Sequence, residues 1–406
     1  MNHEPSPHLS HVAPVAAPRT PPAGKLRHLL SLDDFEKQAR QFLPKPIFEY
    51  VSGGAEDCAS LNDNRAVFNE IGFVTRVLRN VSGRTQATRL FGHTYASPFG
   101  IAPMGISALS AYRGDLVLAQ AAAAAQIPMI MSGSSLIRLE DVITAAPSTW
   151  FQAYLPGEVH KIEPLIDRVI RANAQTLVLT VDTAVLANRE NNIRAGFSTP
   201  LRPSLGLAWQ GVTHPRWLFG TLLRTLATHG MPHFENSSAM RGAPILSARA
   251  VRDFGAKDHL SWEHVALIRQ QWTRTLVIKG LMHADDARTA RDMGVDGVIL
   301  SNHGGRQLDG TVSPLRVLPE VVKAVGPEYP VLMDSGIRRG TDVLKAIALG
   351  AHFVFVGRPF GYAAAVAGQA GVSHAIQLLQ AEIQRDLGLL GLERLSELGP
   401  EQLHRR

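Results

Sequence analysis

The sequence predicts one (β/α)8 barrel (a TIM barrel) with added N-terminal helices, and two regularities support this α/β fold class. After residue 95, eight short apolar runs recur without alternation of apolar and polar residues, which is typical of parallel strands buried on both faces. Helix-like segments separate these runs, and such regular alternation indicates a closed barrel. The chain lacks G-x-G-x-x-G and G-x-x-x-x-G-K-[ST] motifs, so a Rossmann or P-loop fold has little support. A doubly wound open sheet is the structural alternative.

The chain divides into a tail, the barrel and a short C-terminal tail. Residues 1–27 are rich in Pro, Ala and His and lack the apolar core of a secretory signal, so we expect them to be disordered. The barrel domain is expected over residues 28–390, and it begins with short helices at 31–41 and 46–51. Residues 391–406 are expected to form the C-terminal tail.

The barrel elements follow in a regular order with one exception. The predicted strands are 99–103, 128–132, 149–154, 177–182, 276–280, 297–301, 330–335 and 353–358. The predicted helices are 115–126, 139–145, 164–174, 284–294 and 341–350, of which the last two end at glycine, as helix C-termini often do. The exception is a long insertion after the fourth strand, at roughly residues 196–260.

Composition excludes several classes of function. The 406 residues are 45% hydrophobic and 19% charged, which suits a globular protein with a large core. The net charge is +6, but the sequence contains no Lys/Arg tract, so no nucleic-acid partner is expected. Cys58 is the single cysteine, which rules out an internal disulfide and a Cys-based zinc site. We therefore expect a reducing, cytoplasmic compartment and no metal, and no apolar run reaches the ~20 residues that span a bilayer.

One loop carries most of the chemical information. Ser301-Asn302-His303-Gly304-Gly305-Arg306 directly follows the apolar run 297–300. His303 is a base near neutral pH, and Arg306 can bind a carboxylate through two parallel hydrogen bonds. The two glycines allow a tight turn and the close approach of a flat ligand. This loop predicts proton abstraction from a substrate that carries a carboxylate.

The other predicted strands also end in polar or glycine residues, at the end of the barrel where active sites lie. Asp182 could orient His303, or could instead cap a helix or turn. Lys279 could face an electron-rich cofactor ring, or could form a structural ion pair. Arg189 and Arg306 together form a plausible carboxylate clamp. After strands seven and eight, Asp334–Asp342 and Gly357-Arg358 resemble the phosphate site of such barrels, with helix capping as the alternative role of the first segment.

With these residues identified, the chain resembles the FMN-dependent α-hydroxy-acid oxidases and dehydrogenases over about residues 32–390. The segment Ser301–Asp309 carries the resemblance, and Leu43–Lys45, Gly54–Asp57, Thr180–Thr183 and Asp334–Asp342 fit as well. Among these proteins the membrane-associated lactate and mandelate dehydrogenases of bacteria are the most similar.

The resemblance implies a role for each site residue. His303 would be the catalytic base, partnered by Asp182, and the Cα hydrogen of an L-2-hydroxy acid would pass to N5 of FMN. Arg189 and Arg306 would bind the substrate carboxylate, Tyr50 and Tyr154 would hydrogen-bond the substrate, and Lys279 would stabilise the reduced flavin. FMN would contact Pro103, Met104, Gly105, Ser132, Gln152, Thr180, Lys279, Ser301, Asp334, Ser335, Gly336, Ile337, Arg338, Gly357 and Arg358.

Two features bear on the electron acceptor. Similar dehydrogenases tend to have glycine at the position of Gly105, where oxidases more often have alanine. The insertion places Trp209, Trp217, Leu218, Phe219, Leu222, Leu223 and Leu226 among Arg202, Arg216 and Arg224. Such a segment is typical of a helix lying in a membrane interface, or it packs on the barrel or another subunit. We expect electrons to pass to membrane quinone at the inner face of the cell membrane, with an oxygen-using oxidase that forms hydrogen peroxide as the alternative.

Ser134 bears on the substrate. Glycolate oxidases carry tryptophan at this position, so serine leaves room for a lactate-like or mandelate-like side chain. An FMN-dependent isomerase such as type 2 isopentenyl diphosphate isomerase is a competing function, but it needs no His/Arg carboxylate site. A membrane-binding module on an inactive barrel is another, against which the complete set of strand-end residues argues. The resemblance also implies a homo-oligomer, most often a tetramer.

Overall fold

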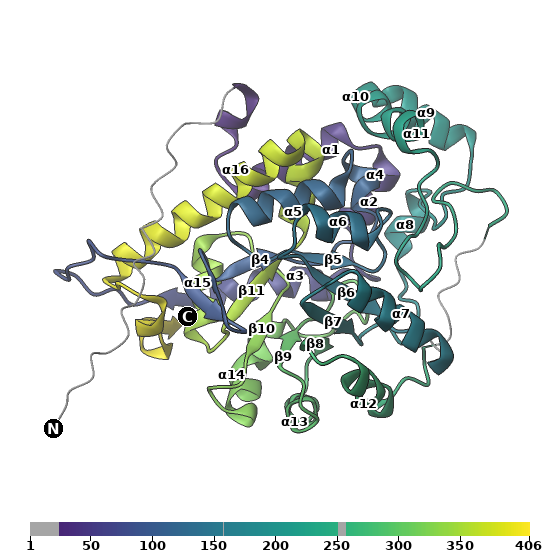
Figure 1. Cartoon of the computed structure of the whole chain (residues 1–406). Helices are drawn as coiled ribbons and strands as arrows, with labels where there is room; N and C mark the ends of the chain where they lie inside the picture. The colour runs from purple at the N-terminus through teal and green to yellow at the C-terminus, as the bar shows by residue number, and fades with distance from the viewer. Residues whose placement is uncertain (1–23, 157, 251–256) are drawn as a thin grey trace.

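The structure, a computed structural model, describes residues 24–156, 158–250 and 257–406 (Figure 1). The disordered tail expected at 1–27 therefore lies mostly outside the described residues, and Gly24–His28 forms a short 3-10 helix, η1.

Eight parallel strands form the predicted barrel. They are β4 (Phe99–Ile101), β5 (Ile130–Ser132), β6 (Trp150–Tyr154), β7 (Thr176–Thr180), β8 (Thr275–Leu281), β9 (Gly297–Leu300), β10 (Val331–Met333) and β11 (Phe353–Val356). Their order in the sheet is β4-β11-β10-β9-β8-β7-β6-β5. A parallel bridge between Ile101 and Met129 joins the two ends of this sheet, so the barrel is closed rather than doubly wound.

Helices surround the strands, as the alternation predicts. The covering helices are α5 (Gly114–Ala124), α6 (Leu139–Ala145), α7 (Val159–Arg171), α12 (Trp262–Gln271), α13 (Ala284–Asp292), α14 (Pro314–Val325), α15 (Gly340–Ala348) and α16 (Arg358–Leu390). The predicted N-terminal helices are α1 (Leu32–Phe42) and α2 (Lys45–Ser52), followed by α3 (Ala59–Ala66), η2 (Val67–Glu70) and, after β4, α4 (Ser107–Ser110). Helix α1 packs along α16.

The end of the barrel opposite the carboxyl ends of its strands is filled by large side chains. These side chains form a hydrophobic cluster separate from the main core, and a hairpin of β2 (Thr88–Leu90) and β3 (His93–Tyr95) contributes Leu90 and Tyr95 to it. The Tyr95 ring lies 5.6 Å from that of Phe353, and Trp150 lies 5.4 Å from Phe355. These side chains close this end of the barrel to ligands.

The last residues differ from the expected tail. The segment 391–406 contains η4 (Leu395–Glu397), η5 (Pro400–Gln402) and β12 (Leu403–Arg405). Strand β12 pairs with β1 (Ile71–Phe73) in an antiparallel sheet, and Leu392, Leu395 and Leu398 are buried. These leucines and the sheet bind the C-terminal segment to the barrel, so treating it as a separate tail was wrong.

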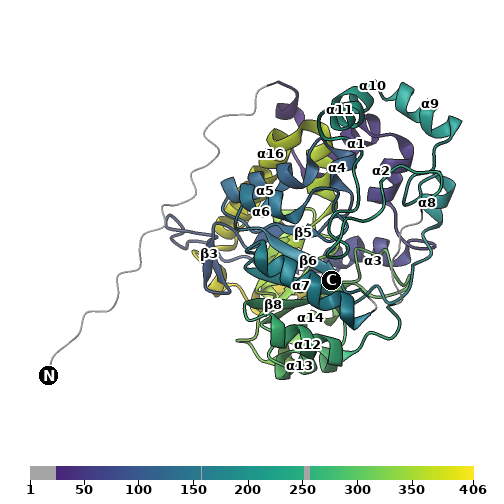
Figure 2. The ribbon, with the colours of Figure 1, turned by 45° about the vertical axis from the view of Figure 1, so that its right-hand side comes forward.

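The long insertion lies at one edge of the barrel. It follows α8 (Glu190–Arg194) and contains α9 (Leu205–Thr213), α10 (Pro215–Trp217), the π-helical turn η3 (Leu218–Leu223) and α11 (Arg224–His229). Both ribbon views place α9, α10 and α11 together, on the side away from the β2–β3 hairpin (Figure 2). None of the described helices is both long and apolar enough to cross a bilayer.

Only some of the apolar side chains predicted to lie in a membrane interface are exposed on the insertion. Trp217 is 2% exposed, and its indole N–H donates to the carbonyl of Leu109. Leu218 and Leu222 pack against the core. The alternative of packing on the barrel therefore holds for these residues, whereas Trp209 and Phe219 stay exposed.

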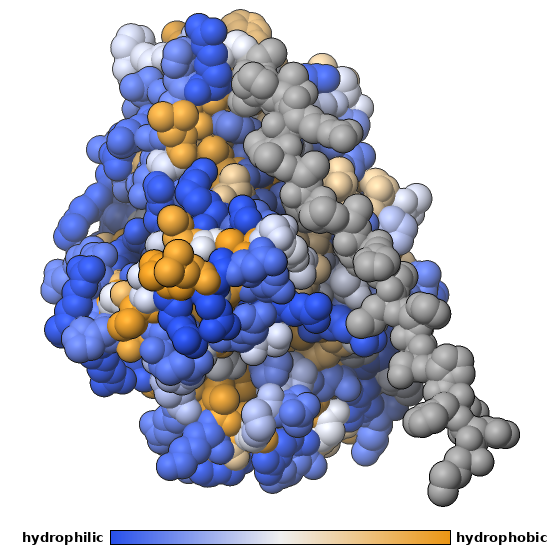
Figure 3. Space-filling model, turned by 90° about the vertical axis from the view of Figure 1, so that its left-hand side faces the viewer, coloured by the Kyte–Doolittle hydropathy of each residue, from blue (hydrophilic) through white to orange (hydrophobic). Residues whose placement is uncertain are grey.

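The opposite side of the molecule is mostly hydrophilic. Figure 3 shows this face, on the left in Figure 1, with its hydrophobic residues in separate small areas. The segment between β1 and β2 projects toward this side and carries Val77 and Leu78, which are both strongly exposed.

Candidate active site

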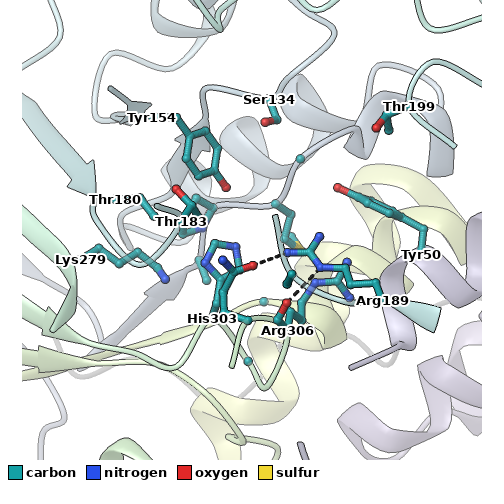
Figure 4. A pocket seen from close by; sticks show the side chains of 18 of the residues that line it. Tyr50, Ser134, Tyr154, Thr180, Thr183, Arg189, Thr199, Lys279, His303 and Arg306 are labelled. Carbon is teal, nitrogen blue, oxygen red and sulfur yellow. Dashed lines mark hydrogen bonds between the residues drawn. The ribbon is translucent and has the colours of Figure 1, made fainter. Parts of the chain in front are cut away.

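A cavity of about 1090 Å³ opens at the carboxyl ends of the barrel strands. Its wall contains residues from most of these strand ends, among them Tyr154, Thr180, Lys279 and His303 (Figure 4). Barrel enzymes bind substrates and cofactors at this end. The cavity is therefore the candidate active site.

His303 lines this cavity and is paired with Asp182, and both side chains are mostly buried. Nδ1 of His303 lies 2.9 Å from Oδ1 of Asp182, and their side chains are 18% and 12% exposed. Burial lowers the pKa of His303 below its usual value, although Asp182 opposes this shift. Burial alone would raise the pKa of Asp182, but His303 and Lys279 outweigh it and the pKa is lowered. The imidazole is thus neutral at pH 7, with Nε2 left to accept a proton.

The loop conformation explains why the sequence needs these residues in this order. His303, Gly304 and Gly305 all have positive φ, of 56°, 67° and 73°. A Cβ at Gly305 would lie 2.5 Å from the backbone nitrogen of Leu61, so only glycine fits there. The amide of His303 donates to Oγ of Ser301, which helps to set the histidine backbone at the cavity wall.

Arg189 and Arg306 reach the same cavity from different elements. Nε of Arg189 donates to the carbonyl of Arg306, and its Nη2 donates to Oε1 of Gln307 at 2.6 Å (Figure 4). Arg306 donates to the carbonyl of Gly53 at 2.7 Å. Burial and the nearby Arg189 and Arg358 lower the pKa of Arg306 to about 9. Such crowded cations favour the binding of an anion between them.

Two tyrosines face the cavity from opposite sides (Figure 4). Tyr50 stacks on Phe197, with ring centroids 4.5 Å apart, and the Arg306 guanidinium lies 5.2 Å from the Tyr50 ring centroid. Burial raises the pKa of Tyr154, so its phenol remains a hydrogen-bond donor. Both hydroxyls are placed to bind polar groups of a ligand in this cavity.

Lys279 is held as a buried cation. Its Nζ donates to Oγ of Ser301 at 2.7 Å and lies 3.1 Å from Oδ2 of Asp334. Burial alone would lower the pKa of Lys279, but Asp334 and Asp182 outweigh it and the pKa is raised. Lys279 thus forms an ion pair and also lies at the cavity wall. A structural ion pair and a position facing a cofactor ring, the two roles considered for this lysine, are therefore compatible.

Two buried polar atoms fit a flat, polar cofactor such as FMN: Thr180 lines the cavity, and Gln152 lies two residues before the lining residue Tyr154 on β6. Gln152 Nε2 and Thr180 Oγ1 are buried and have no hydrogen-bond partner within the described chain. The other end of the Gln152 amide accepts from the Ser132 hydroxyl and from the Gly133 amide, both at 3.2 Å. Buried polar groups are nearly always paired, so these two atoms indicate a ligand with complementary donors and acceptors.

The expected phosphate end is only partly as predicted. The first amides of α15 are already occupied: Asp342 accepts from Arg338 and Arg339, and Glu382 accepts from Gly340. The capping role considered for Asp342 is therefore present. Gly357 and Arg358, at the start of α16, line the cavity with Arg338. An anion would therefore meet the first turn of α16 rather than that of α15.

Arg358 and Ser335 connect the loops around this end. Arg358 donates to the carbonyls of Val51, Gly53 and Gly304. The Ser335 hydroxyl donates to Asp334 and accepts from the Gly304 amide. Burial lowers the pKa of Arg358 to about 10.

The structure brings the predicted site residues together. Pro103, Met104 and Gly105 line the cavity from the end of β4, and Asp334, Ser335, Gly336 and Ile337 line it after β10. Ser132, Gln152 and Ser301 are buried and are not among the residues that line the cavity. Sequence reasoning missed Gln307, which holds Arg189 and also donates to the carbonyl of Asp182. Its place directly after Arg306 was the available signal.

Comparisons with known proteins show the family of the chain. The family described as FMN-dependent dehydrogenase matches residues 39–405. The L-lactate dehydrogenase of Xanthomonas euvesicatoria pv. vesicatoria (strain 85-10) is 39% identical, over 92% of this chain and 95% of that protein. The (S)-mandelate dehydrogenase of Pseudomonas putida is 36% identical, over 93% and 94%. A crystal structure of the monotopic membrane protein (S)-mandelate dehydrogenase has a TM-score of 0.86 at 35% identity, covering 93% of this chain and 100% of that one.

Proposed function

Because the chain belongs to the FMN-dependent dehydrogenase family, we propose that it oxidises an L-2-hydroxy acid to the 2-oxo acid, with a lactate-like or mandelate-like substrate. The observation that carries this proposal is that His303, paired with Asp182, lines one cavity with Arg189 and Arg306. A base and a carboxylate site side by side are what abstraction of a proton from a hydroxy acid requires.

Each side chain has a task that follows from its contacts. Arg189 and Arg306 bind the substrate carboxylate, and Tyr50 and Tyr154 donate to its oxygens. His303 accepts the hydroxyl proton at Nε2, because Nδ1 is engaged by Asp182. The carboxylate of Asp182 then stabilises the imidazolium. Positioning both reaction partners in a water-poor cavity supplies much of the rate gain.

FMN fits the cavity wall through the unpaired Gln152 Nε2 and Thr180 Oγ1. When bound, FMN supplies the acceptor for the hydrogen and two electrons that leave the substrate C2. Lys279 keeps its charge in the wall and would stabilise negative charge on the ring. The remaining proposed contacts are Pro103, Met104, Gly105, Ser132, Ser301, the segment 334–338, Gly357 and Arg358.

The electron acceptor we propose is membrane quinone. Exposed Leu205, Trp209, Val212, Phe219 and Leu223 support a surface on the insertion that lies in a membrane interface. Arg202 and Arg216 are exposed in the same segment and would meet anionic headgroups. Membrane association is consistent with the monotopic relative. The oxidase alternative is not favoured, because the two curated relatives described above are named dehydrogenases.

Assembly and compartment complete the proposal. We propose a homotetramer in the cytoplasm, attached peripherally to the membrane. The exposed Val77 and Leu78 support a contact between subunits, because apolar side chains on a projecting loop gain by burial. Light scattering after gel filtration would give the mass of the particle, and a monomer of 44.0 kDa would refute the assembly.

A direct experiment tests the function. Purified protein, loaded with FMN and kept anaerobic, is mixed with L-lactate, (S)-mandelate and glycolate while flavin absorbance is recorded. We expect bleaching by lactate or mandelate to exceed that by glycolate. Reoxidation is then compared between oxygen and a soluble quinone, and quinone should be faster.

A further inference from the structure

The wall of the cavity opposite the histidine carries hydroxyl groups. Ser134, after β5, and Thr199, after α8, lie on the far side of the cavity from His303 and the two arginines (Figure 4). The proposed chemistry requires the carboxylate and the C2 hydroxyl of the substrate to lie near His303. The substrate side chain therefore extends toward Ser134 and Thr199.

Thr199 stands out because its neighbours already have partners. The Ser198 hydroxyl donates to the carbonyl of Pro200 and accepts from the amide of Arg202. The Phe197 ring stacks on Tyr50. The Thr199 side chain lines the cavity, is only partly exposed and makes no hydrogen bond to the described part of the chain. Its hydroxyl is thus available to a ligand.

The residues next to Thr199 favour a neutral hydrogen-bonding group, although the charged Lys257 and Asp258 also line the cavity. Phe197 and Phe234 contribute apolar surface to this end of the cavity. Lys161, which also lines the cavity, is 2.9 Å from Glu158. A threonine hydroxyl can donate and accept, but it offers no charge to a second carboxylate. A ligand hydroxyl matches both the apolar walls and this partner.

We infer that Thr199 is a specificity-determining residue, and that the preferred substrate is an L-2-hydroxy acid whose side chain carries a second hydroxyl. This inference rests on the proposed oxidation of L-2-hydroxy acids. In the absence of such a hydroxyl, the Thr199 hydroxyl stays unpaired beside the bound side chain, which weakens binding.

The test uses two matched pairs of ligands. L-lactate is compared with L-glycerate, and (S)-mandelate with (S)-4-hydroxymandelate, since the members of each pair differ by one hydroxyl. The variant Thr199→Val removes the protein hydroxyl at nearly constant shape. Rapid-mixing measurements give kcat/KM for flavin reduction, and absorbance titrations with the corresponding 2-oxo acids give Kd without turnover.

We expect Thr199→Val to weaken the hydroxylated member of at least one pair by about three- to tenfold, the range of one net hydrogen bond. The member without the hydroxyl should change less than twofold. An equal change in both members of each pair, or no change in either, would overturn the inference. Thr289→Val, on α13 outside the cavity lining, is the matched control for the substitution. If no hydroxy acid bleaches the wild-type flavin, the proposed function fails instead, so the two failures are distinguishable.

Discussion

The variant Asp182→Asn is the sharpest test of the interaction between the proposed base, His303, and its carboxylate partner. The carboxylate lies 2.9 Å from Nδ1 of His303 and is 12% exposed, so solvent screens the interaction weakly. A hydrogen bond to a charged group contributes about 1.5–3 kcal/mol. Losing it would destabilise the imidazolium that forms during catalysis and slow flavin reduction by about 10–150-fold.

The pH dependence of kcat/KM should also change in a defined direction. In the wild type, activity requires neutral His303 and is lost as pH falls through its pKa, which burial places below the usual value. Asp182 is the main group that opposes this effect, so its removal lowers the pKa of His303 further. The acid limb of kcat/KM should therefore move to lower pH in Asp182→Asn, while the plateau falls.

The assay is anaerobic rapid mixing of the FMN-loaded variant with hydroxy acid from pH 4.5 to 8.5. Asp63→Asn is the control, because Asp63 is also paired with a basic side chain, that of Arg316, but this partner does not line the cavity. A decrease smaller than about threefold, or an acid limb that moves to higher pH, would refute the assigned role of Asp182.

Three other variants probe separate parts of the account. His303→Gln should retain FMN and slow flavin reduction by at least ~10²-fold; near-normal reduction would remove this residue from the base role. Gly105→Ala would place a Cβ 3.0 Å from Ser134 Cβ and 3.1 Å from Tyr50 Oη. We expect KM to rise by about fivefold or more, because overpacking costs about 1–3 kcal/mol. An unchanged KM would contradict this geometry. Gly305→Ala should lower Tm and weaken FMN retention, because the loop has no room at Leu61; a variant as stable as wild type would show that the loop can shift.

Much of the fold follows from the sequence because the strand signals are strong. All eight predicted barrel strands are present, since continuous apolar runs of this length suit a sheet buried on both faces. The β2–β3 hairpin was not predicted, because its short strands are partly exposed and contain no continuous apolar run. The C-terminal strand β12 pairs with β1 more than 300 residues earlier, at Ile71–Arg405, and no local pattern reveals such pairing.

The site was predictable where chemistry depends on residue type, and less so where it depends on contacts. A histidine, two glycines and an arginine after a buried strand indicate a catalytic loop from sequence alone. The sequence does not reveal that Asp342 occupies the first amides of α15, because a carboxylate near a helix start suits both capping and solvent exposure. It also does not reveal that Trp217 is buried, because a tryptophan suits an interface and a core equally.

The most direct measurement is anaerobic flavin bleaching in the FMN-loaded protein, with L-lactate or (S)-mandelate, followed by identification of the product. The account predicts loss of the oxidised flavin spectrum with formation of one equivalent of the 2-oxo acid. A flavin spectrum that persists with every L-2-hydroxy acid offered would contradict it.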